Sequence, residues 1–548
     1  MKALLFLSLV SFAAACGKDE PAALEAPAPT RVVADPKAPD GTLATISLAD
    51  PGPFYAGAAS LFETELVRSI VAPANSGDAL DRLVGVAPQV KKHVPANAPI
   101  AGLVLEAEGR LGVVYAVRLD RVAEGVAPLP GVEVRPGAPA DGFWLLDPSA
   151  PNAAPMALVG DLLLVGTARE AIEQAHAHLA HLVDQKGDAT LRIDFVPEAL
   201  ARRLRPVLED VVRALAQDAL ADAARARAEK GRAPELGEPE TIVTSARDET
   251  LELVALLPDL EALGATLRFE GDMARFDAVL TAKPGSPLAD KLAHEASRGD
   301  VRGLLRALPE DAALAVVVST GDRLVDALEG AAAARLGEAD RARLETALGG
   351  EGARSVALGG DAEGGFLQIA REGGEGRGWA ETLLSIAHVR TLLSALAACP
   401  SPKAAPKLDA SGAGTLCATG AAKSSLAHRE EAGRRALTLA TAEAKSPRKR
   451  APESAPLADK ADAARAIAAL GEPLRFAIYL ESSRVLPSLA IASKRLELKA
   501  LASQLSPRPL LVGGTVEGSR AEVTLVLTRG AIDRTALLLG ELGRVVAD

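Results

Sequence analysis

Two distant segments share a strand–turn–strand pattern, and this pattern constrains the fold more than any other feature of the sequence. Leu267–Leu280 reads LRFEGDMARFDAVL, and Gly514–Leu527 reads GTVEGSRAEVTLVL. In each segment, Glu-Gly and one polar residue separate two short runs that favour β-strands. Because glycine adopts the backbone conformations that tight turns require, Gly271 and Gly518 predict two β-hairpins.

Looser versions of the hairpin pattern lie at Leu103–Leu119 and Val356–Ala370. A second pattern places a helix directly after a β-rich run, where Thr, Asp, Ser or Pro suits a helix start. Segments of this second kind start at Leu191, Leu474, Gly160 and Leu308. The predicted fold class is therefore α+β, with antiparallel-rich sheets and helices packed on one face. The architecture would consist of degenerate strand-turn-strand-helix units, although generic α+β folds also produce some of this pattern.

The first residues, MKALLFLSLVSFAAAC, carry the features of an export signal. Lys2 supplies a positive charge, and an apolar run extends from Ala3 to Ala15. As a helix this run would span about 20 Å, whereas the hydrocarbon layer of a bilayer is roughly 30 Å thick. A short apolar run that ends in small residues predicts a secretory signal peptide, not a membrane span.

Ala13-Ala14-Ala15-Cys16 resembles the lipobox of bacterial lipoproteins, a resemblance that covers residues 1–16 only. In that family the signal is cleaved before the cysteine, which is then acylated. The resemblance implies that residues 1–15 are a signal peptide and that Cys16 carries palmitate and further chains, which anchor stably in a membrane. Gly17 in place of Asp implies sorting to the outer membrane. The alternative is an ordinary signal peptide with a chance cysteine.

Composition divides the remaining chain into predicted segments. Prolines without periodicity predict a disordered tether over residues 16–45. Three α+β domains are expected over residues 46–187, 188–300 and 301–400, and a strand–helix unit over residues 466–548 would complete the last one. Ala, Ser, Pro and Lys dominate residues 401–465, which predicts a low-complexity, mostly disordered insertion. Its basic segment Ser446–Arg450 leaves open a contact with anionic lipid headgroups or lipopolysaccharide.

Lipidation of Cys16 would leave two of the three cysteines, Cys399 and Cys417. An even remainder in an exported chain predicts one disulfide. Closing a loop of this length stabilises a fold by about 3 kcal/mol in the chain-entropy interpretation. A redox pair is the alternative, but the Cys-x-x-Cys spacing that favours it does not occur here.

Three of the seven histidines lie close together, at His176, His178 and His181. On a helix, His178 and His181 share a face, so they are weak candidates for zinc or copper ligands. Metal sites need three or four converging ligands, and this face offers two. The simpler interpretation is a solvent-facing polar stripe, so the sequence predicts no metal and no other cofactor.

The net charge of −11 and the aromatic content of 3% argue against nucleic acid as a partner. None of the common hydrolase or nucleotide-binding motifs occurs, so the sequence predicts no catalytic residues. We therefore expect a lipid-anchored lipoprotein of the outer membrane, on its periplasmic or surface side. It would bind an unidentified protein or lipid, or act structurally. The alternatives are a periplasmic carrier or chaperone for lipid or lipoprotein, and an enzyme with a site assembled from distant residues.

Overall fold

A computed structural model describes residues 38–62, 73–86, 88–107, 109–119, 132–146, 154–185, 187–230, 247–248, 251–252, 254–320, 338–361, 364–373, 376–396, 399, 402, 404–417, 422–431, 434–443, 456–481 and 508–531. The chain divides into two compact units. The N-terminal unit comprises Ala23–Leu204 and Leu260–Ala282, and the C-terminal unit comprises Arg205–Asp259 and Lys283–Asp548. Both units combine antiparallel strands with helices, which confirms the α+β class.

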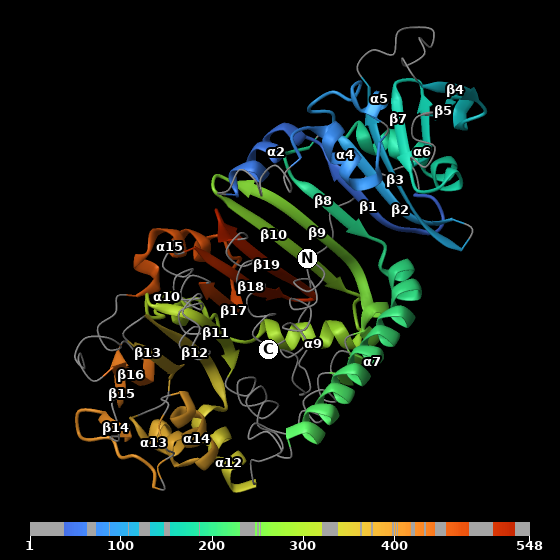
Figure 1. Ribbon diagram of the computed structural model, residues 1–548. Helices are drawn as coiled ribbons and strands as arrows, with labels where there is room; N and C mark the ends of the chain where they lie inside the picture. The colour runs from blue at the N-terminus through green and yellow to red at the C-terminus, as the bar shows by residue number, and fades with distance from the viewer. Residues whose placement is uncertain are drawn as a thin grey trace. The chain divides into compact units, whose positions relative to one another are not determined.

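The described strands of the N-terminal unit are β1 (Thr42–Leu48), β2 (Ile100–Ala107), β3 (Arg110–Arg118), β4 (Glu133–Pro136), β5 (Phe143–Leu146), β6 (Met156–Val159), β7 (Leu162–Gly166), β8 (Leu191–Phe195), β9 (Leu260–Glu270) and β10 (Met273–Ala282). They pair antiparallel in the order β10-β9-β8-β1-β2-β3-β7-β6-β5-β4 (Figure 1). The first strand of the chain therefore lies inside the sheet, with β2 on one side and β8 on the other.

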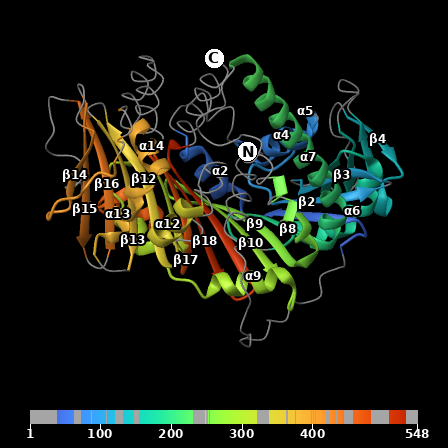
Figure 2. The same ribbon diagram turned by 90° about the horizontal axis from the view of Figure 1, so that it is seen from below.

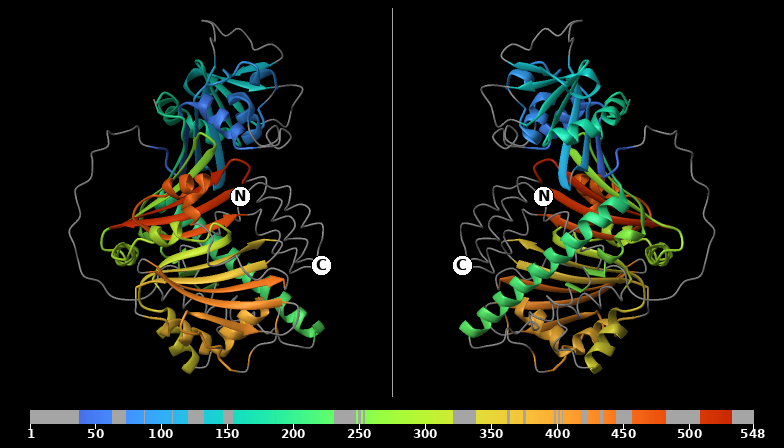
Figure 3. Two further views of the ribbon diagram at one scale, coloured as in Figure 1. Left: turned by 90° about the vertical axis from the view of Figure 1, so that its left-hand side faces the viewer. Right: turned by 90° about the vertical axis from the view of Figure 1, so that its right-hand side faces the viewer.

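The described helices of the N-terminal unit are α2 (Pro51–Ser60), α4 (Ser76–Val84), α5 (Pro88–Lys91), the 3-10 turn η1 (Pro139–Asp141), α6 (Arg169–Val183) and the beginning of α7 (Pro197–Lys230). Local signals explain the ends of α4. The Asn75 side chain accepts a hydrogen bond from the Asp78 backbone N–H, and Gly85 ends the helix in a left-handed conformation. Figure 3 shows α7 as one long helix, which continues through Pro206.

Helices cover both faces of the N-terminal sheet. Tyr115 packs in a cluster with Phe54 of α2 and Leu80 of α4. Its neighbour on β3, Val114, packs in a second cluster with Ile172 of α6. Because consecutive strand residues point to opposite faces, these clusters lie on opposite sides of the sheet. The expectation that helices pack on one face is therefore wrong for this unit.

The described strands of the C-terminal unit are β11 (Ala312–Thr320), β12 (Glu351–Asp361), β13 (Gly364–Glu372), β14 (Ala413–Cys417), β15 (Ala422–Glu431), β16 (Arg434–Glu443), β17 (Leu474–Glu481), β18 (Pro509–Glu517) and β19 (Arg520–Thr528). They pair antiparallel in the order β19-β18-β17-β11-β12-β13-β16-β15-β14. Its described helices are the remainder of α7, η2 (Leu257–Asp259), α9 (Pro287–Ala296), α10 (Arg302–Arg306), α12 (Glu338–Leu348), α13 (Gly378–Ser385), α14 (Ala387–Leu396), η3 (Leu457–Asp459) and α15 (Ala461–Ala468). An apolar cluster joins α12, α13 and α14 to β13, β15 and β16 (Figure 2).

The predicted segment boundaries need correction at two places. Residues 401–465 are not simply an insertion, because β14, β15 and β16 lie within them and belong to the sheet. Small residues such as Ala and Thr alternate with apolar ones there, so the composition resembles low complexity although the pattern is that of a strand. The boundary at 188 is also wrong, since β8 pairs with β1 and is paired in turn with β9.

The two units share one topology. In each, the first strand lies between a hairpin on one side and a later strand on the other, and a second hairpin extends the sheet beyond the first. A third hairpin closes the opposite end, β9–β10 in one unit and β18–β19 in the other. The two clearest hairpin segments in the sequence are these third hairpins, and the two looser ones are β2–β3 and β12–β13. The predicted repetition therefore corresponds to a repeated fold.

The strand register is repeated as well. The pairs that close the hairpins are Ala107–Arg110 and Asp361–Gly364, Val159–Leu162 and Glu431–Arg434, and Glu270–Met273 and Glu517–Arg520. Counted from these turns, equivalent positions make equivalent pairs between the hairpins and their neighbours. Examples are Ala44–Val104 and Leu314–Leu358, Val114–Gly166 and Gln368–Thr438, and Phe195–Leu263 and Leu480–Leu510. Each residue of one sheet can thus be compared with its counterpart in the other.

Candidate functional site

Four charged residues form a row across four neighbouring strands of the C-terminal unit. Arg354 of β12 lies directly opposite Arg371 of β13, which lies opposite Arg435 of β16. Arg435 in turn lies opposite Glu430 of β15. Residues directly opposite one another share a face of the sheet, so we name these four residues the charged row. Two positions before Arg371, Ile369 belongs to the apolar cluster under α12–α14, which places the charged row on the same face.

Arg354 is fully buried and has acceptors for its donor groups. Its Nε donates to the Leu348 carbonyl at 2.9 Å, and its terminal nitrogens donate to further carbonyls. These belong to Gly349 (3.0 Å), Gly352 (2.9 Å), Ala353 (3.1 Å) and Glu372 (3.4 Å). Because the last carbonyls of a helix lack partners within it, Arg354 ends α12 and attaches it to the sheet.

Arg371 and Arg435 are less completely bonded. Arg371 donates from Nη1 to the Ala347 carbonyl at 2.9 Å. Arg435 donates to the Gly373 carbonyl at 2.8 Å and forms an ion pair with Glu430. The Nε atoms of Arg371 and Arg435 are buried, and neither has a hydrogen-bond partner among the described residues. Burial and, after it, the charge of Arg435 lower the pKa of Arg371, which shows that its positive charge is poorly compensated.

The N-terminal unit has apolar residues at the matching positions. Val117 is the counterpart of Arg371, Leu163 of Arg435, and Leu158 of Glu430, and they pair with one another in the same register. Their exposed fractions are 0%, 0% and 3%, and they belong to the apolar core. The shared framework therefore accepts an apolar row at this place, so the fold itself does not require charges there.

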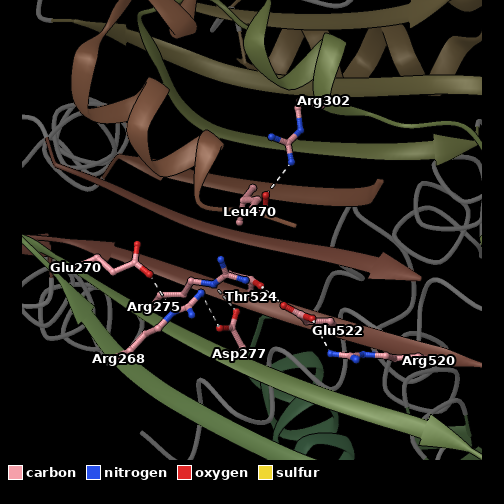
Figure 4. Close-up of polar contacts among 9 residues, drawn as sticks. All are labelled: Arg268, Glu270, Arg275, Asp277, Arg302, Leu470, Arg520, Glu522 and Thr524. Atoms are coloured by element: carbon pink, nitrogen blue, oxygen red, sulfur yellow. Dashed lines mark hydrogen bonds and ion pairs between the residues drawn. The ribbon is translucent and has the colours of Figure 1, made fainter. Parts of the chain in front are cut away.

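Other buried arginines of the C-terminal unit have a clear structural role. Arg302 donates to the carbonyls of Leu470 (2.8 Å) and Gly471 (2.7 Å), beyond the end of α15 (Figure 4). Arg390 donates to Leu384 at 3.0 Å and Ser385 at 2.6 Å, at the end of α13. Each of these arginines satisfies carbonyl groups that a helix end leaves free. Arg371 and Arg435 differ because each has one carbonyl acceptor.

A second polar group lies on the β9–β10 hairpin of the N-terminal unit (Figure 4). Asp277, whose side chain is 8% exposed, accepts from Arg275 at 2.7 Å and lies 3.8 Å from Arg268. Arg268 also pairs with Glu270 at 3.0 Å. Carboxylates and guanidinium groups are balanced here, so this network is internally neutralised. The counterparts of Arg275 and Asp277 on β19 are Glu522 and Thr524, which contact one another at 3.5 Å.

On the same face of the N-terminal sheet, Asp194 of β8 lies opposite Thr45 on one side and Gly264 on the other. Loss of hydration raises the pKa of Asp194, and the charge of Arg192 opposes this only in part. The corresponding face of the C-terminal unit is apolar, since Ala315, Tyr479 and Leu511 occupy the matching row and are fully buried.

The structure joins Cys399 and Cys417 in a disulfide with a Cα–Cα distance of 6.4 Å, the pair that the sequence predicts. The bond connects the segment after α14 to β14, and both cysteines pack against the apolar cluster under α12–α14. Ser424 of β15 accepts a hydrogen bond from the Cys417 backbone N–H at 3.0 Å. The lipidation candidate Cys16 lies outside the described residues, as does the basic segment Ser446–Arg450.

The three histidines lie on α6, as expected, but they do not form a solvent-facing stripe. His178 is 7% exposed and packs into the buried side of α6, whereas His181 is exposed. His176 contacts the Glu173 carbonyl through Nδ1 at 2.9 Å. Over the described part of the chain, no three side chains of His, Cys, Asp or Glu converge in a way that could hold a metal ion.

None of the described helices has both the length and the apolar composition needed to cross a membrane. Sequence reasoning missed the charged row, because its four members come from two hairpins and become neighbours only through the pairing of β13 with β16. No protein family matches the chain, and comparisons with curated proteins and with solved structures give no significant match.

Proposed function

We propose that this chain is a lipoprotein of the cell envelope, anchored at the outer membrane through Cys16, and that its folded units act as a non-catalytic binding module. The N-terminal segment that resembles a lipobox supports the anchor. The Cys399–Cys417 disulfide supports an oxidising compartment outside the cytoplasm, because disulfides of this kind persist there.

The observation that carries the binding role is the difference between two otherwise matching sheets. Val117, Leu163 and Leu158 fill one row with apolar side chains, while the counterparts in the C-terminal unit are two arginines and a glutamate. Burying charges costs free energy that apolar side chains of similar volume do not cost. A charged row that is dispensable for the fold is therefore best explained by a contact that the protein makes with a partner.

The anchor is tested by growing cells that express the full chain with radioactive palmitate. Wild-type protein should take up label and fractionate with membranes, whereas Cys16→Ser should take up no label. The matched control replaces the other two cysteines, Cys399→Ser and Cys417→Ser, and should keep the label. Equal palmitate uptake by wild type and Cys16→Ser, or no uptake by wild type, would contradict the proposed anchor.

A further inference from the structure

We propose that the charged row is a binding site for an oxyanion, a phosphate or carboxylate group held by Arg371 and Arg435. The inference rests on the proposed binding function and names its ligand class. Guanidinium groups bind both kinds of anion through paired N–H donors, with a geometry that lysine does not offer.

The charges of the row leave one guanidinium uncompensated. Arg371 and Arg435 are directly opposite on neighbouring strands, where like charges are unfavourable. Glu430 forms an ion pair with Arg435, but no described carboxylate forms one with Arg371. An anion between the two arginines would remove this repulsion, which makes the row complementary to a negatively charged group.

The hydrogen-bond donors of the row lead to the same ligand. A guanidinium has five N–H donors, and Arg371 uses one of them on the Ala347 carbonyl. The side chain of Arg435 is 8% exposed, and its buried Nε has no partner among the described residues. Buried donors without acceptors are costly, so an acceptor with several oxygens would satisfy them.

Solvent reaches the row from its glutamate end. The Glu430 side chain is 49% exposed, and Arg371 is half-buried, while Arg354 is completely enclosed. An anion can therefore approach Arg371 and Arg435 without unfolding the sheet. Arg354 is already saturated by carbonyl groups and serves to attach α12.

Helix capping alone does not explain Arg371 and Arg435. Arg302 and Arg354, which cap helices, donate to three and five carbonyl groups respectively. Arg371 donates to one and Arg435 to one. The counterparts Val117 and Leu163 show that the same sheet position is stable without any arginine.

The experiment measures the melting temperature and, by calorimetry, the affinity of the purified full chain for inorganic phosphate and for acetate. Sodium chloride of equal ionic strength is the reference for both anions. We expect a saturable rise in melting temperature with at least one oxyanion and none with chloride. A response to phosphate alone identifies a phosphate group as the ligand, and a response to acetate identifies a carboxylate.

The key variant combines Arg371→Val, Arg435→Leu and Glu430→Leu, which are the residues of the N-terminal unit at these positions. It should fold, because its counterpart row is stable, and should lose the response to the anion. Arg371→Gln removes one guanidinium with little change in volume and should weaken binding at least tenfold. The matched control Arg520→Gln, which changes an exposed arginine on β19, should bind as the wild type does.

The proposal is overturned if neither oxyanion gives a saturable response in the wild type, or if Arg371→Gln binds as tightly as Arg520→Gln. This outcome is independent of the anchor, because palmitate uptake at Cys16 does not involve the row. A labelled protein without an anion response would retain the lipoprotein proposal and reject the oxyanion site.

Discussion

Arg354 of β12 donates a hydrogen bond from Nε to the carbonyl oxygen of Leu348, the last residue of α12. A strand side chain thereby does the work that a glycine or a solvent molecule usually does at the end of a helix. The contact is completely enclosed, since the exposed fraction of Arg354 is 0%.

Replacing this arginine should destabilise the C-terminal unit strongly. Arg354→Met keeps most of the side-chain volume but leaves several buried carbonyl groups without donors, each of which is costly. We expect the free energy of unfolding to fall by about 3 kcal/mol or more. Urea unfolding measures this loss. Arg341→Met is the control on α12 itself, where the arginine is 59% exposed, and should change stability by about 0.5 kcal/mol or less.

The disulfide should contribute to stability mainly through the loop it closes. The two cysteines are separated by 18 positions, and the chain-entropy interpretation assigns about 3 kcal/mol to such a loop. The double variant Cys399→Ser with Cys417→Ser should therefore unfold at lower urea concentration than the wild type. Cys16→Ser, which removes the third thiol, should leave the midpoint unchanged. A double variant as stable as wild type would contradict the structural role of the bond.

Glu372 should make stability depend on pH. Burial, followed by the nearby charge of Asp300, raises the pKa of Glu372, against weaker opposing contributions from a backbone N–H and Arg354. Between the ordinary Glu pKa of about 4.3 and the raised value, the folded state binds more protons than the unfolded state, so stability falls as pH rises through this window. Glu372→Gln should lack this decline and be more stable at neutral pH. Unfolding in urea at several pH values tests this, with the exposed Glu517→Gln as control.

The close contact between α2 and β9 should tolerate no side chain at Gly57. A Cβ atom on Gly57 would lie 2.4 Å from the Cβ atom of Phe269, which belongs to the N-terminal sheet. Gly57→Ala should therefore cost about 1 to 3 kcal/mol through forced movement of α2. Gly299→Ala is the control, because a Cβ atom there meets nothing within 4 Å. Equal melting temperatures for both variants would contradict this packing.

Sequence reasoning succeeds here where the signal is local. The Glu-Gly turns at Gly271 and Gly518 predict hairpins correctly, because two residues and their backbone conformation determine such a turn. The α+β class follows from the same hairpins together with the helix starts. The pairing of Cys399 with Cys417 needs only the count of cysteines in an exported chain.

The remaining features depend on pairing between distant segments. No local pattern reveals that Arg371 lies opposite Arg435, because the two strands are brought together by the sheet and not by a turn. The strands over residues 401–465 were hidden by their content of small residues. The burial of His178 likewise follows from how α6 packs on its sheet, while the helical period indicates only which residues share its face.

The strand order also determines when each unit can be completed. Ala44 of β1 pairs with Phe195 and Leu314 of β11 pairs with Leu480, so the strand synthesised first waits for a neighbour synthesised much later. Until then one edge of the central strand has no hydrogen-bonding partner, and such edges invite aggregation. Pairings of long sequence separation also form slowly. Nascent chains of this protein therefore depend on being kept apart from one another before the last hairpin of each unit arrives.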